Sequence, residues 1–371
     1  MKKKNFICIF PQGENIHLIK DVGMIPFVLG KEGYYNTTIA FYEDQINLPY
    51  LRNEVNGLNY ERIPRLFKYE SINILLFLIK NLSKYNIVMF FHGGKGKIFN
   101  VLFFKLITLK RMKFYFKLDM DSSEINNNFN KKSIRFKLTK VFSSYIDLLT
   151  VESIKMNDFL NKESFYRTKY LPNGYLEEVV NKVDSETEKE NIIITVGRLG
   201  TNQKDTETFL KALAKLDLKD WKVKLIGPIA ESFQYVIKSF FEENPHLKEK
   251  VIFMGNISDR QELKSLYSKA KIFTLTSRNE GFPLVFPEAI ANGCYIVTTD
   301  LAPAYDITNN GEYGRLFTIG NDRQLAIILQ EVIDGKIDLP DKEKIRAYAK
   351  KNFDWNAIAQ KLYQYLEGKD N

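Results

Sequence analysis

Cysteine and long apolar runs are both scarce in this sequence of 371 residues. The longest clean apolar run, residues 74–79, has the size of a core segment, whereas a membrane-spanning helix needs roughly 18 such residues. Only two cysteines are present, Cys8 and Cys294, far apart in apolar, strand-like contexts. These scarcities argue against a membrane-spanning or disulfide-stapled protein and predict a cytoplasmic chain in a reducing compartment.

Charge of both signs is present but unevenly distributed. Residues 1–175 hold 27 Lys and Arg against 15 Asp and Glu, whereas the rest of the chain holds 27 against 30. Residues 95–140 contain twelve basic and three acidic side chains, interleaved with Phe, Leu and Ile. This composition suits an anionic membrane surface, and an ordinary solvated basic face stays open as the alternative. Nucleic-acid binding is not expected, because no recognition motif accompanies the charge.

Short apolar runs alternate with helix-length segments along the whole chain, a pattern typical of parallel sheets covered by helices. The length favours about two domains. We therefore expect an α/β protein with two doubly wound Rossmann-like domains, residues 1–180 and 181–350, joined by the polar linker 181–190. Strands are predicted at 6–10, 38–41, 87–91, 114–118, 148–151, 192–196, 223–226, 251–254, 272–276 and 295–298.

The stretch SRNEGFPLVFPEAIANG, residues 277–293, connects two predicted strands and contains two glutamates, Glu280 and Glu288. Pro287 suits the first position of a short helix, and Asn292-Gly293 suits its end. The helix would begin at the carboxyl edge of the sheet, where ligands of such folds bind.

Phosphate binding is expected at this helix start. Free backbone amides near Leu284, Val285 and Phe286 favour an anion, and Gly281 allows close approach. Glu288 would accept hydrogen bonds from vicinal ribose hydroxyls, and Glu280 would lie nearer the phosphate end. The alternative is a helix N-terminus that the carboxylates merely stabilise.

A second loop points to the same ligand. The segment GRLGTNQKDTETFLKALAKL follows a predicted strand, and Arg198 and Lys204 flank its glycine-containing loop. Two cations at the carboxyl end of a strand suit a diphosphate, because Arg offers a planar fork of donors and Lys a point charge.

Together with YLPNGY and VIFMGNISDRQELKSLYSKAKIFTLTSRNEGFPLVFPEAIANG, these motifs resemble the retaining glycosyltransferases of family 4, which have the GT-B fold. The resemblance covers residues 170–300. It implies that Arg198 and Lys204 hold the donor diphosphate, that Glu288 holds the ribose, and that Glu280 lies by the transferred sugar. It also implies donor contacts from Ile257, Gly281, Phe282, Leu284 and Val285.

The sequence departs from the family pattern at two positions, Pro283 and Asp205, where glycine is common. The chain end, residues 351–371, resembles the family's C-terminal helix that crosses back to the first domain. In the first half, HLIKDVGMIPFVLGKEGY resembles the family's glycine-containing loop and first helix, which implies that Gly23 approaches the diphosphate. His92 follows a predicted strand where family members often keep a histidine facing the donor sugar.

A metal site is a competing possibility. Asp119 and Asp121, in KLDMD, have the spacing of an Asp-x-Asp motif that holds a divalent cation under a diphosphate. We favour a metal-free site without a cofactor, because Arg198 and Lys204 already supply positive charge.

The resemblance implies a retaining hexosyl- or N-acetylhexosaminyl-transferase. The expected donor is a UDP-linked sugar, and the expected acceptor is a glycan, a lipid-linked glycan or a glycoprotein in cell-surface polysaccharide synthesis. Peripheral attachment to the inner face of the cell membrane would fit the basic segment. The alternatives are a GT-B nucleotide-sugar epimerase and a non-catalytic partner subunit of a glycosyltransferase complex.

Overall fold

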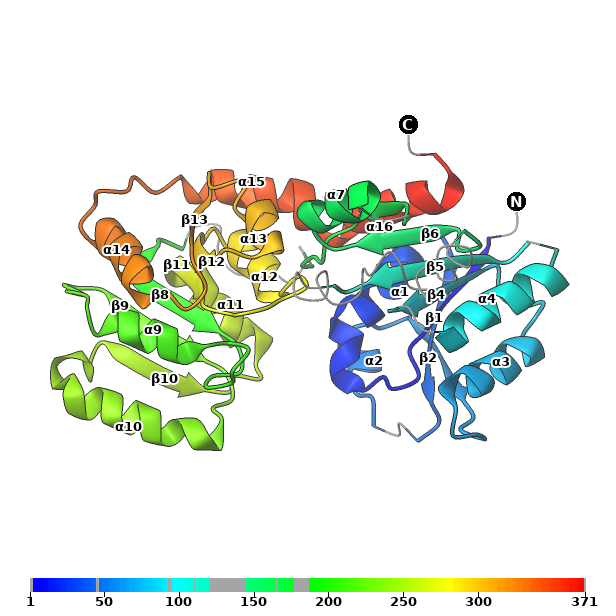
Figure 1. The fold of residues 1–371 in the computed structure, drawn as a ribbon, viewed down its shortest axis with the longest axis horizontal. Coiled ribbons are helices and arrows are strands. Elements are labelled where there is room, and N and C mark those ends of the chain that lie inside the picture. The colour runs from blue at the N-terminus through cyan, green and yellow to red at the C-terminus, as the bar shows by residue number, and fades with distance from the viewer. Residues whose placement is uncertain are drawn as a thin grey trace. The chain divides into compact units, whose positions relative to one another are not determined.

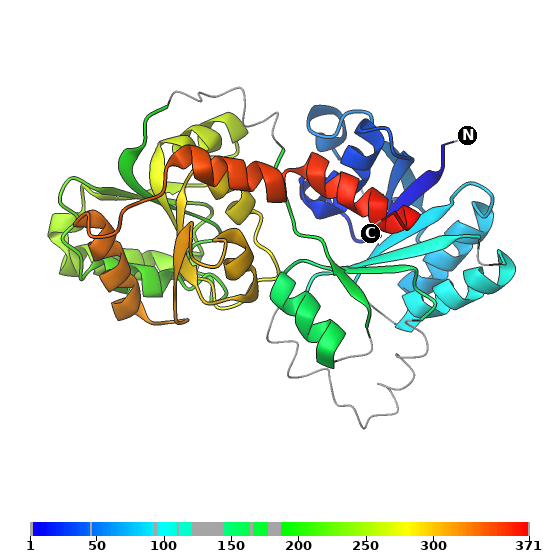
Figure 2. The same cartoon turned by 90° about the horizontal axis from the view of Figure 1, so that it is seen from above.

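The computed structural model describes residues 3–44, 47–92, 95–109, 111–120, 144–163, 166–176 and 187–369. The chain divides into two compact units, Met1–Asn173 with Trp355–Asn371, and Gly174–Asp354. Each unit is built on one parallel sheet with helices packed around it (Figures 1 and 2).

The first unit contains a seven-stranded sheet. Its strands are β1 (Asn5–Ile9), β2 (Asn36–Tyr42), β3 (Asn59–Ile63), β4 (Ile87–Phe91), β5 (Lys113–Leu118), β6 (Leu148–Val151) and β7 (Thr168–Tyr170). They pair in the order β3-β2-β1-β4-β5-β6-β7. The helices described in this unit are the short 3-10 helix η1 (Asn15–Ile19), α1 (Asp21–Lys31), α2 (Tyr50–Asn53), α3 (Glu70–Lys80), α4 (Lys95–Ile107), α7 (Ile154–Glu163) and α16 (Trp355–Glu367).

The second unit contains a six-stranded sheet. Its strands are β8 (Glu190–Val196), β9 (Lys222–Ile226), β10 (Val251–Gly255), β11 (Ala270–Leu275), β12 (Tyr295–Thr299) and β13 (Gly314–Phe317), in the order β10-β9-β8-β11-β12-β13. The helices are α9 (Thr206–Leu213), η2 (Glu231–Phe233), α10 (Gln234–Glu243), η3 (Pro245–Leu247), α11 (Arg260–Lys269), α12 (Val285–Ala291), α13 (Ala302–Ile307), α14 (Asp322–Ile333) and α15 (Lys342–Phe353).

The central strands of the second sheet are buried on both faces. Ile193 of β8 belongs to a core cluster with residues of α9 and α14. Its neighbours Ile192 and Ile194 belong to a second cluster with residues of α11, α12 and α15. Successive side chains of a strand point to opposite faces, so a strand covered on both sides needs an unbroken apolar run.

All ten predicted strands are present, with ends shifted by no more than two residues. Three further strands, β3, β7 and β13, were not predicted, and each lies at the edge of its sheet. An edge strand buries fewer side chains, as in β3, where only Ile63 is buried. Its sequence therefore lacks the apolar run that reveals a central strand.

The C-terminal helix α16, red in Figures 1 and 2, belongs to the first unit and packs against α1. The rings of Tyr34 and Tyr363 stack with centroids 4.5 Å apart, and the Tyr35 hydroxyl donates to Glu367 Oε1 at 2.7 Å. The preceding helix α15 packs in the second unit, where the amide of Tyr175 donates to the carbonyl of Phe353 at 2.9 Å. No helix among the described ranges is long and apolar enough to traverse a bilayer.

Candidate functional site

The site residues predicted in the second half gather at the carboxyl edge of the second sheet. Lys204 lies in the loop after β8, and Glu280 lies in the segment after β11. Lys204 Nζ is 2.5 Å from Glu280 Oε1, and the two side chains are only 15% and 9% exposed. β8 and β11 are adjacent parallel strands, so the loops that follow them start at the same edge of the sheet. Lys204 and Glu280, which are distant in the sequence, therefore form an ion pair that is largely shielded from solvent.

Gln203 connects this ion pair to Arg198. The exposed Arg198 guanidinium donates from Nη2 to Gln203 Oε1 at 2.7 Å. Gln203 Nε2 in turn donates to the carbonyl of Asn279 at 3.2 Å and lies 3.5 Å from Glu280 Oε2. The two loops are therefore joined, and Arg198 is oriented beside the Lys204–Glu280 pair.

Two backbone positions shape the loop after β8. Gly200 has a φ of +79°, and a Cβ there would lie 2.2 Å from Phe233 Cβ, so only glycine fits. Asp205, at the position where the family commonly has glycine, has a φ of +46°. Its carboxylate accepts from the Thr208 hydroxyl at 2.8 Å and lies 2.9 Å from Arg278 Nη2. Aspartate thus takes the left-handed conformation that suits glycine.

The helix after Glu280 starts earlier than predicted. α12 begins at Val285, so Pro287 is its third residue and not its first. The prediction was wrong by two positions because every amide of the first turn lacks an intrahelical acceptor, which makes proline acceptable at several of them. Gly293, with a φ of +75°, follows the end of the helix as predicted.

Two of the three expected free amides are present at the start of α12. Within the described part of the chain, the amides of Leu284 and Val285 donate to no backbone carbonyl. The amide of Phe286, in contrast, donates to the carbonyl of Pro283 at 3.0 Å, so this part of the prediction was wrong. The proline therefore takes part in the turn that opens the helix.

Glu288 lies in the first turn of α12 and is partly buried. The buried Tyr267 hydroxyl donates to Glu288 Oε2 at 3.3 Å. Burial raises the pKa of Glu288 above the usual 4.5, while the positive charge of Arg260 and the Tyr267 hydrogen bond oppose the shift. A carboxylate has about four lone-pair sites, so Glu288 keeps capacity for further donors such as hydroxyls.

Two residues predicted to contact the donor, Ile257 and Phe282, differ in how deeply they are buried. Ile257 follows β10 and is partly buried against the core cluster that includes Phe286. Phe282 is buried, and its ring centroid lies 5.7 Å from that of Phe353. The Phe282 side chain is thus part of the core.

In the first unit, Gly23 lies in the first turn of α1 rather than in a loop. A Cβ at this position would lie 2.1 Å from the carbonyl oxygen of Leu18, so packing against the preceding turn is sufficient to require glycine. His92 follows β4, is exposed and has a φ of +54°. Its amide donates to the carbonyl of Lys117 at 3.0 Å.

Part of the basic segment 95–140 points inward. Lys117 is fully buried, contacts Glu152 Oε1 and lies 3.0 Å from Asp21 Oδ2. Lys105 lies 2.6 Å from Asp147 Oδ2 and is also buried. These two lysines neutralise internal carboxylates, so they do not add to a basic surface.

The described residues do not test the Asp-x-Asp motif. Asp119 is exposed, whereas Asp121 lies outside the described residues. Within the ranges that the structure describes, no group of three His, Cys, Asp or Glu side chains is placed to hold a metal ion.

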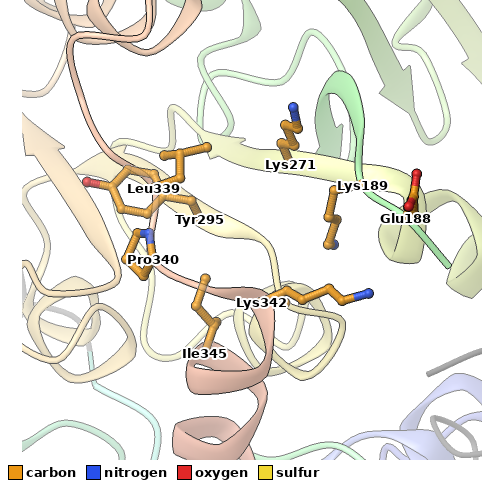
Figure 3. Close-up of a pocket in the computed structure, with 9 residues that line it drawn as sticks. Glu188, Lys189, Lys271, Tyr295, Leu339, Pro340, Lys342 and Ile345 are labelled. Carbon is orange, nitrogen blue, oxygen red and sulfur yellow. The ribbon is translucent and has the colours of Figure 1, made fainter. Parts of the chain in front are cut away.

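A cavity of about 430 Å³ lies at the opposite, amino edge of the second sheet (Figure 3). Its lining includes Lys189, Lys271 and Lys342. Each ammonium already donates to the protein: Lys189 to the carbonyls of Ala270 and Asn292, both at 2.7 Å, Lys271 to Asn191 Oδ1 at 2.6 Å, and Lys342 to the carbonyl of Thr187 at 3.0 Å. We therefore assign this cavity no role in the site.

Sequence reasoning missed Gln203, Tyr267, Arg260 and Arg278. Gln203 and Arg278 are neighbours of predicted residues in the sequence. Their polar amide and guanidinium groups were the only feature that could have marked them as site residues. Tyr267 and Arg260 lie on α11, a helix on which no predicted site residue lies. Their proximity to Glu288 depends on the packing of α11 beside α12, which the sequence does not reveal.

Comparison with known proteins adds three findings. Residues 178–352 match the family model described as glycosyl transferases group 1. The chain is 31% identical over 215 residues to a Campylobacter jejuni enzyme named GalNAc-alpha-(1->4)-GalNAc-alpha-(1->3)-diNAcBac-PP-undecaprenol alpha-1,4-N-acetyl-D-galactosaminyltransferase. This alignment covers 56% of the chain and 55% of the relative, so the chain spans about half the length of this curated relative.

Solved structures match over nearly the whole chain. Sucrose-phosphate synthase from Thermosynechococcus elongatus superposes with a TM-score of 0.73 at 18% identity, over 99% of this chain and 100% of that chain. Anabaena HepE, solved in complex with UDP, gives 0.73 at 16% identity, over 98% and 100%. The chain thus has the architecture of GT-B glycosyltransferases, with two Rossmann-like domains, and its residues 178–352 match the group 1 family.

Proposed function

We propose that the protein is a retaining glycosyltransferase that moves a sugar from a UDP-linked donor to a glycan acceptor. The observation that carries this proposal is the Lys204–Glu280 ion pair, joined through Gln203 to Arg198 at the carboxyl edge of the second sheet. The family match of residues 178–352 supports the assignment of this edge to a nucleotide sugar.

The two cations suit a diphosphate leaving group. When the bond between the anomeric carbon and the donor phosphate breaks, negative charge grows on the phosphate, and donors that are already in place stabilise it. An ammonium has three N–H groups. Lys204 therefore keeps one hydrogen bond to Glu280 and directs others to phosphate oxygens, while Arg198 offers its planar fork.

The transfer step needs no nucleophile from the protein. The acceptor hydroxyl oxygen forms a bond to the anomeric carbon on the face from which the diphosphate departs, and the hydroxyl proton passes to the departing phosphate oxygen. Glu280 orients the sugar, and Glu288 accepts hydrogen bonds from the ribose. The diphosphate is held by Arg198, Lys204 and the amides of Leu284 and Val285, without a metal ion.

The nature of the substrates is supported by the relatives. The name of the Campylobacter jejuni enzyme includes an N-acetylgalactosaminyl group and an undecaprenol-linked acceptor, and HepE binds UDP. We infer an N-acetylhexosamine donor in preference to a simple hexose, and a lipid-linked glycan acceptor at the inner face of the cell membrane.

A donor panel tests the proposal. UDP-N-acetylgalactosamine, UDP-N-acetylglucosamine, UDP-glucose and UDP-galactose are each incubated with a lipid-linked oligosaccharide, with detection of released UDP and determination of the new linkage. We expect turnover with a UDP-N-acetylhexosamine, retention of the anomeric configuration, and activity that survives EDTA. An inverted linkage would contradict the retaining mechanism. Loss of activity in EDTA that manganese restores would contradict the metal-free site.

A further inference from the structure

The first unit exposes large apolar side chains along two helices. On α3, Ile72, Leu76 and Ile79 are 36%, 38% and 43% exposed, and on α4, Phe99 and Leu106 are 59% and 76% exposed. The spacing of each set is helical, so each set forms a stripe along its helix. We call these five residues the α3–α4 surface.

Both stripes lie on the same side of the unit. The inward residues Ile74 of α3 and Phe104 of α4 belong to one core cluster, so the two helices cover the same face of the sheet. The helices lie side by side (Figure 1), and Asn100 of α4 donates to the carbonyl of Ser71 on α3 at 3.0 Å. Their outward stripes therefore lie next to each other on one side of the unit, and exposed apolar groups of this kind mark interaction sites.

The charge around this surface is mainly positive. Residues 66–111 contain eight basic residues and one acidic residue, Glu70, and two of the lysines, Lys84 and Lys105, are paired with Glu61 and Asp147. Exposed basic side chains lie beyond the ends of the stripes, at Lys68, Lys80 and Arg111. Glu70 lies 3.7 Å from Lys97, so its charge is balanced locally. The α3–α4 surface is thus an apolar area with a basic rim.

We propose that the α3–α4 surface docks onto an anionic membrane. The apolar stripes would enter the boundary between headgroups and acyl chains, and the basic rim would meet anionic headgroups. A second copy of the chain fits less well, because a symmetric contact would place two basic rims against each other. The inference rests on the proposed function, since a lipid-linked acceptor requires an enzyme close to the bilayer.

This surface differs from the one that the sequence suggested. The predicted membrane segment was 95–140, of which residues 121–140 lie outside the described ranges. In the described part, two lysines, Lys105 and Lys117, are buried in ion pairs. The stripe on α3 lies outside that segment and was not predicted, because an apolar run such as 74–79 is normally explained by the core alone.

Vesicle flotation tests the inference without donor or acceptor. The full chain is mixed with vesicles of phosphatidylcholine alone or with phosphatidylglycerol, at low and high salt. We expect binding to the anionic vesicles that high salt weakens but does not abolish, because apolar contacts persist. The double variant Phe99→Asp, Leu106→Asp should reduce the bound fraction about tenfold or more, since it removes two apolar groups and adds two repelled charges.

A matched control comes from the second unit. Ile327 on α14 is 59% exposed, so Ile327→Asp makes the same kind of change elsewhere and should bind vesicles like the wild type. A second readout uses Leu106→Trp, whose fluorescence should shift to the blue on anionic vesicles, whereas that of Ile327→Trp should not. These positions are exposed, so folding should be retained.

Three outcomes would overturn the inference: no flotation of the wild type, equal flotation of the double variant, or a dimer that the double variant abolishes. The last would assign the surface to a second copy of the chain. Failure of the proposed function would look different, because the protein would bind vesicles yet consume no UDP-sugar. If the protein transferred sugar to a soluble acceptor but did not float with vesicles, the proposed function would stand and the membrane inference would be wrong.

Discussion

At the scale of single residues, the Lys204–Glu280 pair is the central feature of the proposed site. Both partners are largely buried at a separation of 2.5 Å, so each holds the other in place before any ligand arrives. Positions that are fixed before the reaction are what makes electrostatic stabilisation of a leaving group effective. Glu280 thus has two roles in the proposal, since it orients both the sugar and the lysine that binds the phosphate.

Replacement of Lys204 by alanine should lower kcat by about 10² to 10³, the usual cost of losing one preorganised donor to the developing charge. The matched control is Lys215→Ala, which removes an ion pair of equal length, 2.5 Å to Asp322, outside the site. Transfer rates with saturating donor provide the measurement. Equal rates for both variants would show that Lys204 does not contact the leaving group.

Glu288 should make donor binding dependent on pH. The pKa of this partly buried carboxyl is raised above 4.5, and only the ionised form accepts hydrogen bonds with both oxygens. The affinity for UDP should therefore fall as the pH is lowered toward the raised pKa, while Glu288→Gln should bind more weakly at neutral pH and show a flatter profile. Calorimetric titration with UDP across pH 5 to 8 gives both results.

The same substitution should affect stability in the opposite direction. A raised folded-state pKa means that ionisation costs more in the folded than in the unfolded protein, so this carboxyl loses stabilisation as the pH rises through that pKa. Glu288→Gln should thus melt at a higher temperature than the wild type at pH 8, and the difference should vanish near pH 4. A glutamine variant that melts at a lower temperature at pH 8 would contradict the assigned shift.

At the scale of elements, Asp205 joins the start of α9 to the loop that contains Lys204. It has a left-handed backbone, and its carboxylate meets Thr208 and Arg278. The variants Asp205→Ala and Asp205→Gly both lack the carboxylate, but only the alanine variant keeps a Cβ on a residue with left-handed backbone angles. We expect Asp205→Ala to be less stable than Asp205→Gly by about 1 kcal/mol. Denaturant unfolding of the pair measures this, and equal stabilities would show that the backbone is not strained.

Helix α16 should contribute strongly to the first unit. Leu362 is fully buried and lies on the same helical face as Ile358 and Leu366, which are buried as well. Leu362→Ala should cost about 2–5 kcal/mol of unfolding free energy, because it removes buried methyl groups and leaves a cavity. Gln364→Ala, at an exposed position of the same helix, should be nearly neutral. A loss below that range would show that α16 is only loosely attached.

The sequence predicted central elements better than edges and packing. Runs such as 192–196 and 87–91 revealed buried strands because such strands need apolar side chains on both faces. The sequence placed Lys204 and Glu280 in the same part of the fold because both follow the ends of predicted strands, and the structure brings them together. The site was not predictable where helices pack against each other, since the contact of Tyr267 with Glu288 joins α11 to α12. The inward direction of Lys105 and Lys117 was missed because a count of charges does not show burial.

At the scale of the whole molecule, the first unit is assembled from both ends of the chain. Residues Trp355–Asn371 belong with Met1–Asn173, whereas the second unit is continuous from Gly174 to Asp354. The ribosome synthesises the chain from its N-terminus, so α1 emerges early and has no α16 to pack against until residues 355–367 have been synthesised. Until then its partner surface stays uncovered, and a chaperone has a long interval in which to bind it.

The order of maturation should therefore be the reverse of the order in the sequence. In a nascent chain stalled with residues 1–354 outside the ribosome, the second unit should resist protease while the first is cleaved, and both should resist once residue 371 has emerged. Pulse proteolysis of stalled chains checks this expectation. A first unit already resistant at the shorter length would mean that α16 closes a fold which is complete without it.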